Sequence, residues 1–157
     1  MKLASSLATA LLVAASLGAQ EQEKKISKKE LPAPVLEAFQ KAYPKANIKG
    51  LNEEMKDGKT YFEIESKEGK MERDLLYLAD GSVVEIEESV TVADLPAAVK
   101  GAVEAKYPKA KMAKAEKVTK GADISYSVKV KTGKGKATLN VDASGKILKE
   151  EKPGGKK

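Results

Sequence analysis

The stretch LPAPVLEAFQKAYPKA at residues 31–46 recurs as LPAAVKGAVEAKYPKA at residues 95–110. The same offset of 64 positions aligns residues 31–87 with residues 95–151 without a gap. About 17 of the 57 aligned positions are identical, and the shared prolines and several glycines fall at matching places. A repeat of this length indicates one structural unit that the chain uses twice.

Each copy opens with a predicted helix. Pro32 and Pro96 stand where the first helical turn tolerates proline, because its N–H groups have no acceptor inside the helix. In the first copy, apolar residues recur at spacings of three and four from Val35 to Tyr43, which is the period of an amphipathic helix. The proline of each YPKA motif ends the helix, because the residue before a proline avoids helical geometry.

Four short extended segments follow each helix, separated by turn signals such as Asp57-Gly58 and Asp80-Gly81. Connections this short favour antiparallel pairing, because a parallel connection needs a crossover of about a dozen residues. The sequence therefore predicts an α+β fold of two tandem repeats, each one helix followed by a four-stranded antiparallel sheet. The predicted strands are residues 46–56, 59–67, 71–79 and 82–89, then 110–119, 124–131, 136–142 and 146–151.

The beginning of the chain has the layout of a secretory signal peptide. Met1-Lys2 precede an uncharged run from Leu3 to Leu17, and the chain becomes polar after Ala19. The run is shorter than the roughly 20 apolar residues of a membrane-spanning helix, so we expect export to the periplasm or beyond and no transmembrane segment in the mature chain. The expected organisation is a signal peptide (1–19), a flexible leader (20–30), repeat 1 (31–94), repeat 2 (95–151) and a basic flexible tail (152–157).

The composition excludes several kinds of catalytic centre. The chain contains no His and no Cys, so Ser-His-Asp and Cys-His centres, disulfides and the usual His/Cys zinc sites are impossible. Carboxylates such as Glu63 and Glu72 could in principle act as acid and base, but acids that alternate on an exposed strand are usually solvated. We therefore expect no enzyme activity, no cofactor and no metal site. Weak binding of a divalent cation stays open, although no EF-hand spacing is present.

A period of two assigns the two faces of the predicted strands. Phe62, Ile64, Leu75 and Tyr77 are expected to point toward the helix. The opposite face carries no helix, and we expect a partner to bind there. The candidate partner-binding residues on that face are Tyr61, Glu63, Glu65, Glu72, Asp74, Leu76, Leu78, Lys129, Lys131 and Lys136.

The two copies carry opposite charge. Residues 31–94 have 8 basic and 14 acidic side chains, a net charge of −6, whereas residues 95–157 have 16 and 6, a net charge of +10. This difference has two interpretations: mutual attraction between the copies, or a polarised surface that steers a charged partner. The lysines suit an anionic envelope polymer or a lipid headgroup. A single Arg and few aromatic residues argue against nucleic acid.

The LPxxV and YPxA motifs, the extended runs and the closing Asp80-Gly81 and Ser144-Gly145 turns resemble the PepSY-like domain. That family is grouped with the beta-lactamase-inhibitor-like proteins of the bacterial envelope, and the resemblance covers residues 30–151. It implies secreted or periplasmic proteins built from tandem helix-and-sheet units, with binding or inhibition rather than catalysis and no catalytic residue.

Two functions remain open on this basis. The expected one is a secreted or periplasmic non-enzymatic binding module, inhibitor-like in architecture, whose partner is a protein of the cell envelope or the secreted space. The alternative is an envelope- or matrix-associating protein that binds anionic polymer or lipid through the basic second repeat.

Overall fold

The computed structural model of the chain describes residues 22–133 and 135–152. The predicted signal peptide and residues 153–157 of the predicted tail lie outside these ranges. Neither helix in the described ranges has the length and apolar character that crossing a membrane requires.

Two α-helices and nine strands follow one another along the described residues. All eight predicted strands are present, with ends that differ from the prediction by at most two residues. The element bounds are β1 Gln22–Lys25, α1 Ala33–Ala42, β2 Asn47–Lys56, β3 Lys59–Glu68, β4 Met71–Tyr77, β5 Val83–Val90, α2 Ala97–Lys106, β6 Lys111–Lys120, β7 Asp123–Thr132, β8 Gly135–Asp142 and β9 Ile147–Glu151.

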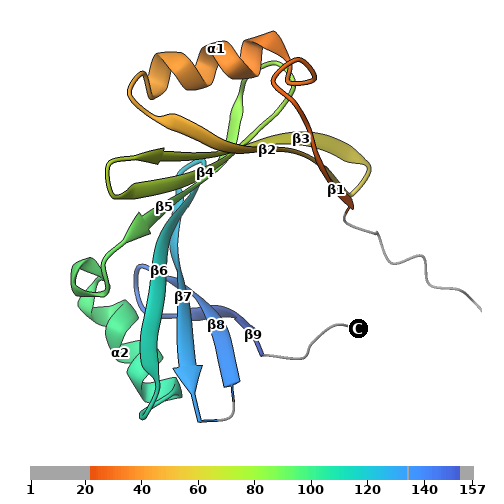
Figure 1. Ribbon diagram of the computed structural model, residues 1–157. Helices are drawn as coiled ribbons and strands as arrows, with labels where there is room; N and C mark the ends of the chain where they lie inside the picture. The colour runs from red at the N-terminus through yellow and green to blue at the C-terminus, as the bar shows by residue number, and fades with distance from the viewer. Residues whose placement is uncertain (1–21, 134, 153–157) are drawn as a thin grey trace, which may run out of the picture.

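The strands form one continuous sheet, so the prediction of two separate four-stranded sheets is wrong. All nine strands are antiparallel and lie in the order of the chain, β1 to β9 (Figure 1). Strands β5 and β6 join the two halves, from the pair Ile86 and Thr119 to the pair Val90 and Ala115. Two separate sheets would each leave an edge of unpaired backbone N–H and C=O groups at this point, and the β5–β6 pairing satisfies both edges.

A ninth strand lies at the N-terminal edge of the sheet, within the segment expected to be a flexible leader (20–30). Strand β1 pairs with β2, from Gln22 with Met55 to Lys25 with Asn52. All four residues of β1 are exposed, so backbone hydrogen bonds rather than burial hold the strand in place. A strand that buries no apolar side chain has no apolar pattern by which the sequence could reveal it.

The two helices cover the same side of the sheet, each over its own core. Helix α1 buries Val35 and Phe39, and helix α2 buries Val99 and Val103. The inward orientation predicted for four strand residues is confirmed, because all four are buried in the α1 core: Phe62, Ile64, Leu75 and Tyr77. We call β1–β5 with α1 the first half and α2 with β6–β9 the second half.

The strand register shows that the α1 core and the α2 core lie on the same side of the sheet. Residues that face each other across antiparallel strands lie on one face, and Ile86 on β5 pairs with Leu75 of the α1 core. Val90, four residues further along β5, lies on the same face and pairs with Ala115 of the α2 core. The other side of the sheet carries no helix in the described ranges, and we call it the open face.

The sheet is bent, with both helices on the outer side and the open face on the inner side (Figure 1). Register shifts occur in β2 between Ile48 and Gly50, and at the equivalent position of β6 between Met112 and Lys114. A second shift, at the end of β4, recurs at the end of β8. Such bulges increase the local twist and bend of a strand, and both halves bend at matching positions.

Candidate functional site

The open face collects side chains from every strand of the sheet. Of the ten predicted binding residues, the structure places nine in strands with open-face register: Tyr61, Glu63 and Glu65 on β3, Glu72, Asp74 and Leu76 on β4, Lys129 and Lys131 on β7, and Lys136 on β8. The tenth, Leu78, follows the end of β4, where its backbone N–H donates to the carbonyl of Ser82.

The first half of the open face is acidic and is organised around one buried amide. Asn52 on β2 is only 1% exposed, and its Nδ2 donates to Glu63 at 2.7 Å and to Glu65 at 3.2 Å. Gly50 leaves room for this arrangement, because a Cβ there would lie 2.6 Å from a carboxylate oxygen of Glu65. The amide therefore holds two carboxylates of β3 on the surface of the sheet.

Burial changes the acidity of three carboxyl groups in this acidic region. It raises the pKa of Glu63 and of Asp74 above their ordinary values. Glu87 on β5 is affected most: burial, followed by the negative charges of Glu116, Glu85 and Asp74, raises its pKa to about 7. At neutral pH the Glu87 carboxyl is therefore only partly ionised.

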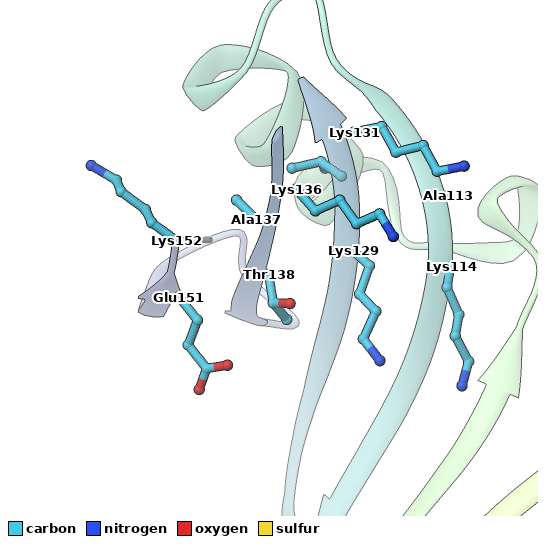
Figure 2. A pocket seen from close by; sticks show the side chains of 10 residues that line it. Ala113, Lys114, Lys129, Lys131, Lys136, Ala137, Thr138, Glu151 and Lys152 are labelled. Carbon is cyan, nitrogen blue, oxygen red and sulfur yellow. The ribbon is translucent and has the colours of Figure 1, made fainter. Parts of the chain in front are cut away.

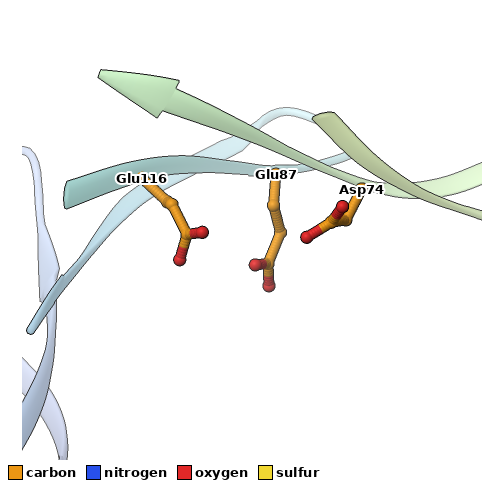
Figure 3. Close-up of side chains that lie close together, drawn as sticks. All are labelled: Asp74, Glu87 and Glu116. Carbon is orange, nitrogen blue, oxygen red and sulfur yellow. The ribbon is translucent and has the colours of Figure 1, made fainter. Parts of the chain in front are cut away.

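Asp74, Glu87 and Glu116 converge from three neighbouring strands, β4, β5 and β6 (Figure 3). One carboxylate oxygen from each lies within 4.8 Å of the others. Lys114 neutralises part of this charge through an ion pair with Glu116 at 2.6 Å. Glu87 and Glu116 were not predicted as site residues, because their proximity depends on the β5–β6 pairing. We assign no metal site to these oxygens and describe them as part of an acidic surface.

A hollow of about 550 Å³ lies where the two halves meet. Its apolar lining comes from Val118, Ile124 and Leu148, and the last two are 42% and 55% exposed. An ion pair of 3.0 Å between Lys120 and Glu85 connects β6 to β5 beside it. This hollow was not predicted, because its three apolar residues come from three different strands and share no local sequence pattern.

The second half of the open face is basic. Lys114, Lys129 and Lys136 extend their side chains from β6, β7 and β8 on one side of the sheet (Figure 2). They line a hollow of about 400 Å³ together with Ala113 and Val130. The opposite charge predicted for the two copies is therefore present on one continuous surface.

Solved structures share this fold. A crystal structure described as a "putative periplasmic" protein from Bacteroides eggerthii is 19% identical over 76% of this chain and 87% of its own, with a TM-score of 0.65. A DUF2874 family protein from Bacteroides ovatus is 22% identical over 76% of this chain and 86% of its own, with a TM-score of 0.62. A BLIP-like protein from Bacteroides fragilis is 20% identical over 75% of this chain and 83% of its own, with a TM-score of 0.58.

The family comparison agrees with the resemblance seen in the sequence. No curated protein matches the chain. The family model described as "Putative beta-lactamase-inhibitor-like, PepSY-like" matches twice, at residues 19–84 and 60–149. The two matches overlap and together extend over most of the chain. The chain therefore belongs to the PepSY-like family of beta-lactamase-inhibitor-like proteins.

Proposed function

We propose that this chain is a non-enzymatic binding module of the periplasm, which holds a protein partner against its open face. Membership of the PepSY-like family supports a binding role. The periplasmic description of the Bacteroides eggerthii structure and the predicted signal peptide support the location. The inhibitor-like architecture is consistent with the BLIP-like protein of Bacteroides fragilis, whose fold this chain shares.

The observation that carries the proposal is the hollow of the second half that borders β5 on the open face. Ile124 and Leu148 expose apolar side chains there, with charged residues on both sides. Protein interfaces have the same arrangement, in which apolar anchors fill pockets and a polar rim surrounds them. Because the hollow lies on the inner side of the bend, a convex segment of a partner would contact both halves of the sheet (Figure 1).

The charge of the open face would set the orientation of the partner. The acidic region of β2–β5 and the lysines of β6–β8 give the surface two ends of opposite sign. Complementary charges speed up encounter and suppress wrong orientations more than they add affinity. We therefore expect the partner to carry cationic groups opposite the first half, and its association rate to fall as salt increases.

A carboxylate enzyme, with Glu63 and Glu72 as its acid and base, is a third hypothesis besides the binding module and the polymer-binding alternative. Glu72 is exposed and forms an ion pair with Lys67 at 3.3 Å, while Glu63 accepts a hydrogen bond from Asn52. An enzyme would lose turnover in a Glu63→Gln, Glu72→Gln variant across a panel of glycoside substrates. A binding module would show no turnover with or without the two substitutions.

The experiment is a pull-down with the mature protein from periplasmic extract, followed by purification of the recovered partner and a direct affinity measurement. Leu148→Asp and Leu76→Asp should each weaken binding, because each places a carboxylate on the open face. Val83→Asp is the matched control: Val83 is 47% exposed but pairs with Tyr77 of the α1 core. Equal loss of affinity in all three variants, or in the control alone, would contradict binding at the open face.

A further inference from the structure

Strands β6, β7 and β8 place lysines directly opposite one another. Lys114 pairs with Lys129, and Lys131 pairs with Lys136. We call these four residues the lysine cluster; Figure 2 shows their side chains around one hollow. Like charges directly opposite each other on antiparallel strands are destabilising, and Lys111 opposite Lys131 adds a third repulsive pair beside these two.

The first half has a neutralised pair at one of these positions. The offset of 64 residues matches Lys131 and Lys136 with Lys67 and Glu72, which also face each other across their strands. Lys67 and Glu72 form an ion pair of 3.3 Å. The scaffold therefore accommodates an ion pair at this position, and the second half has a lysine in place of its acid.

The two halves also differ in how they relieve repulsion. In the first half, Glu63 and Glu65 both accept hydrogen bonds from the amide of Asn52. The raised pKa of Glu87 indicates that this carboxyl group instead takes up a proton. In the lysine cluster, Lys114 forms an ion pair with Glu116. Lys129, Lys131 and Lys136 are exposed and form no ion pair with any residue in the described ranges. Their charges are therefore available to an anionic ligand, beside the one carboxylate in the described lining of the hollow, that of Glu151 (Figure 2).

The surroundings of the cluster indicate the chemistry of that anion. The hollow of about 400 Å³ is within the size range of small-ligand sites. Thr138 lines it, and Ser127 and Asn140 face each other on the same open face one step along β7 and β8. Hydroxyl and amide groups beside ammonium groups can hydrogen-bond a ligand that has both hydroxyl and carboxylate groups.

Other polyanions fit this surface less well. Its described lining holds no Arg and no aromatic side chain, the groups that bind nucleic acid bases and planar rings. None of the large apolar side chains exposed in the described ranges belongs to it, so nothing would insert into a lipid bilayer. The cluster also lies on the inner side of the bend, where a flexible polymer can enter and a flat membrane cannot (Figure 1).

We propose that the lysine cluster of β6–β8 binds a carboxylate-bearing polysaccharide. The sugar carboxylates bridge the opposed lysines, and the hydroxyl groups of the sugar lie beside Ser127, Thr138 and Asn140. This site does not require the protein partner proposed above, because none of its four lysines lines the hollow of Ile124 and Leu148, although Asn140 also borders that hollow.

The central test uses Lys136→Glu, which gives the second half the charge pair of Lys67 and Glu72. The probe is a short oligogalacturonate, titrated into the mature protein and followed by calorimetry at low and at physiological salt. Removing a repulsive pair should raise the melting temperature, whereas affinity for the probe should fall by roughly tenfold or more. A variant that is both more stable and weaker in binding cannot owe its weaker binding to misfolding.

Lys129→Glu should lower affinity to a similar degree. Lys59→Glu is the matched control, because Lys59 is an exposed strand lysine of the first half, and affinity should stay unchanged in that variant. Unchanged affinity in both Lys129→Glu and Lys136→Glu would overturn the proposal, as would failure of the wild type to bind the probe at low salt.

Two further probes distinguish the polysaccharide from other anions. Poly-L-glutamate has carboxylates without hydroxyl groups, and phosphatidylglycerol vesicles present phosphates on a flat surface. Tighter binding of oligogalacturonate than of either probe supports the proposal. Equal or tighter binding of poly-L-glutamate would assign the cluster to an acidic protein segment, and equal binding of the vesicles would assign it to a membrane. Both results would contradict a polysaccharide site, and neither would affect the Leu148→Asp test of the protein partner.

Discussion

The two halves of this protein share one backbone plan, but they carry different side chains at one position of the sheet. Arg73 on β4 lies over the ring of Tyr43, 4.8 Å from its centroid, and forms ion pairs with Glu88 at 2.8 Å and Glu68 at 3.2 Å. Its counterpart in the second half is Ala137. There a hollow of about 480 Å³ is lined by Tyr107, Thr132 and Ala137, the counterparts of Tyr43, Glu68 and Arg73.

This difference shows how a duplicated scaffold can specialise without changing its fold. The backbone turns, the bulges and the helix–sheet contacts recur in both halves. The charged side chains between them do not recur, and the first half has an internal network where the second has lysines and open space. Substitutions that convert a position of one half into its counterpart, and substitutions at features that both halves share, test this comparison through the stability of the protein.

The largest expected effect comes from a feature that the halves share. Gly81 and Gly145 have positive φ angles of 86° and 92°. A Cβ at Gly81 would lie 2.6 Å from the backbone oxygen of Pro34 in α1, and a Cβ at Gly145 would lie 2.7 Å from the backbone oxygen of Ala98 in α2. Gly81→Ala and Gly145→Ala should each destabilise the protein by about 2–4 kcal/mol, since backbone strain and a clash add. Chemical denaturation measures the effect.

Gly58→Ala is the control for this comparison. Gly58 also has a positive φ, of 73°, but nothing lies within 4 Å of its would-be Cβ. Its substitution should cost only about 1 kcal/mol, which is the conformational strain alone. If Gly58→Ala cost as much as Gly81→Ala, the contact between turn and helix would not be what requires glycine.

The next effect concerns Arg73 itself. Arg73→Ala makes the first half resemble the second and leaves Glu68 and Glu88 half-buried without their cation. We expect a loss of about 2 kcal/mol in the free energy of unfolding, measured by urea denaturation.

The reciprocal change tests the same network in the second half. Ala137→Arg alone should not stabilise the protein, because Lys152 occupies the position equivalent to Glu88. Adding Lys152→Glu should recover about 1 kcal/mol relative to the single variant. Absence of any coupling in this double-mutant cycle would show that the vacant space does not accept the network of the first half.

The acidic region should make stability depend on pH. Because the folded-state pKa of Glu87 is about 7 and its ordinary value is 4.5, the folded protein holds more protons between these values. The contribution of this group to stability is therefore lost as pH rises through 4.5 to about 7. After allowance for solvent screening, we expect about 1 kcal/mol more stability near pH 5 than near pH 8. Glu87→Gln should reduce this difference, as thermal melts across that range would show.

The smallest effect is the charge pair that distinguishes the two open faces. Glu72→Lys recreates in the first half the like-charge pair of Lys131 and Lys136, and it should destabilise the protein by about 0.5 kcal/mol. The loss should shrink in high salt, because exposed charges are screened. A loss of the same size at every salt concentration would indicate a packing effect rather than repulsion.

Much of this structure could be predicted from residues that lie close together in sequence. The helices between the LPxxV and YPxA motifs and the eight strands after them follow from local apolar periods and turn residues. The period of two also placed Glu63, Asp74 and Lys129 on the face opposite the helices, in agreement with the register. Strand β1 and the hollow around Leu148 were missed, because neither depends on a local apolar pattern.

Local side-chain patterns specify the duplicated helix-and-strand plan, the inward residues of each half and the opposite charge of the two copies. The pairing of β5 with β6, the single bent sheet and the meeting of Asp74, Glu87 and Glu116 across the junction arise only in the folded chain. Side-chain patterns report which face of a strand is buried. Backbone N–H and C=O groups, which decide which strands become neighbours, are the same in nearly every residue and leave no such pattern.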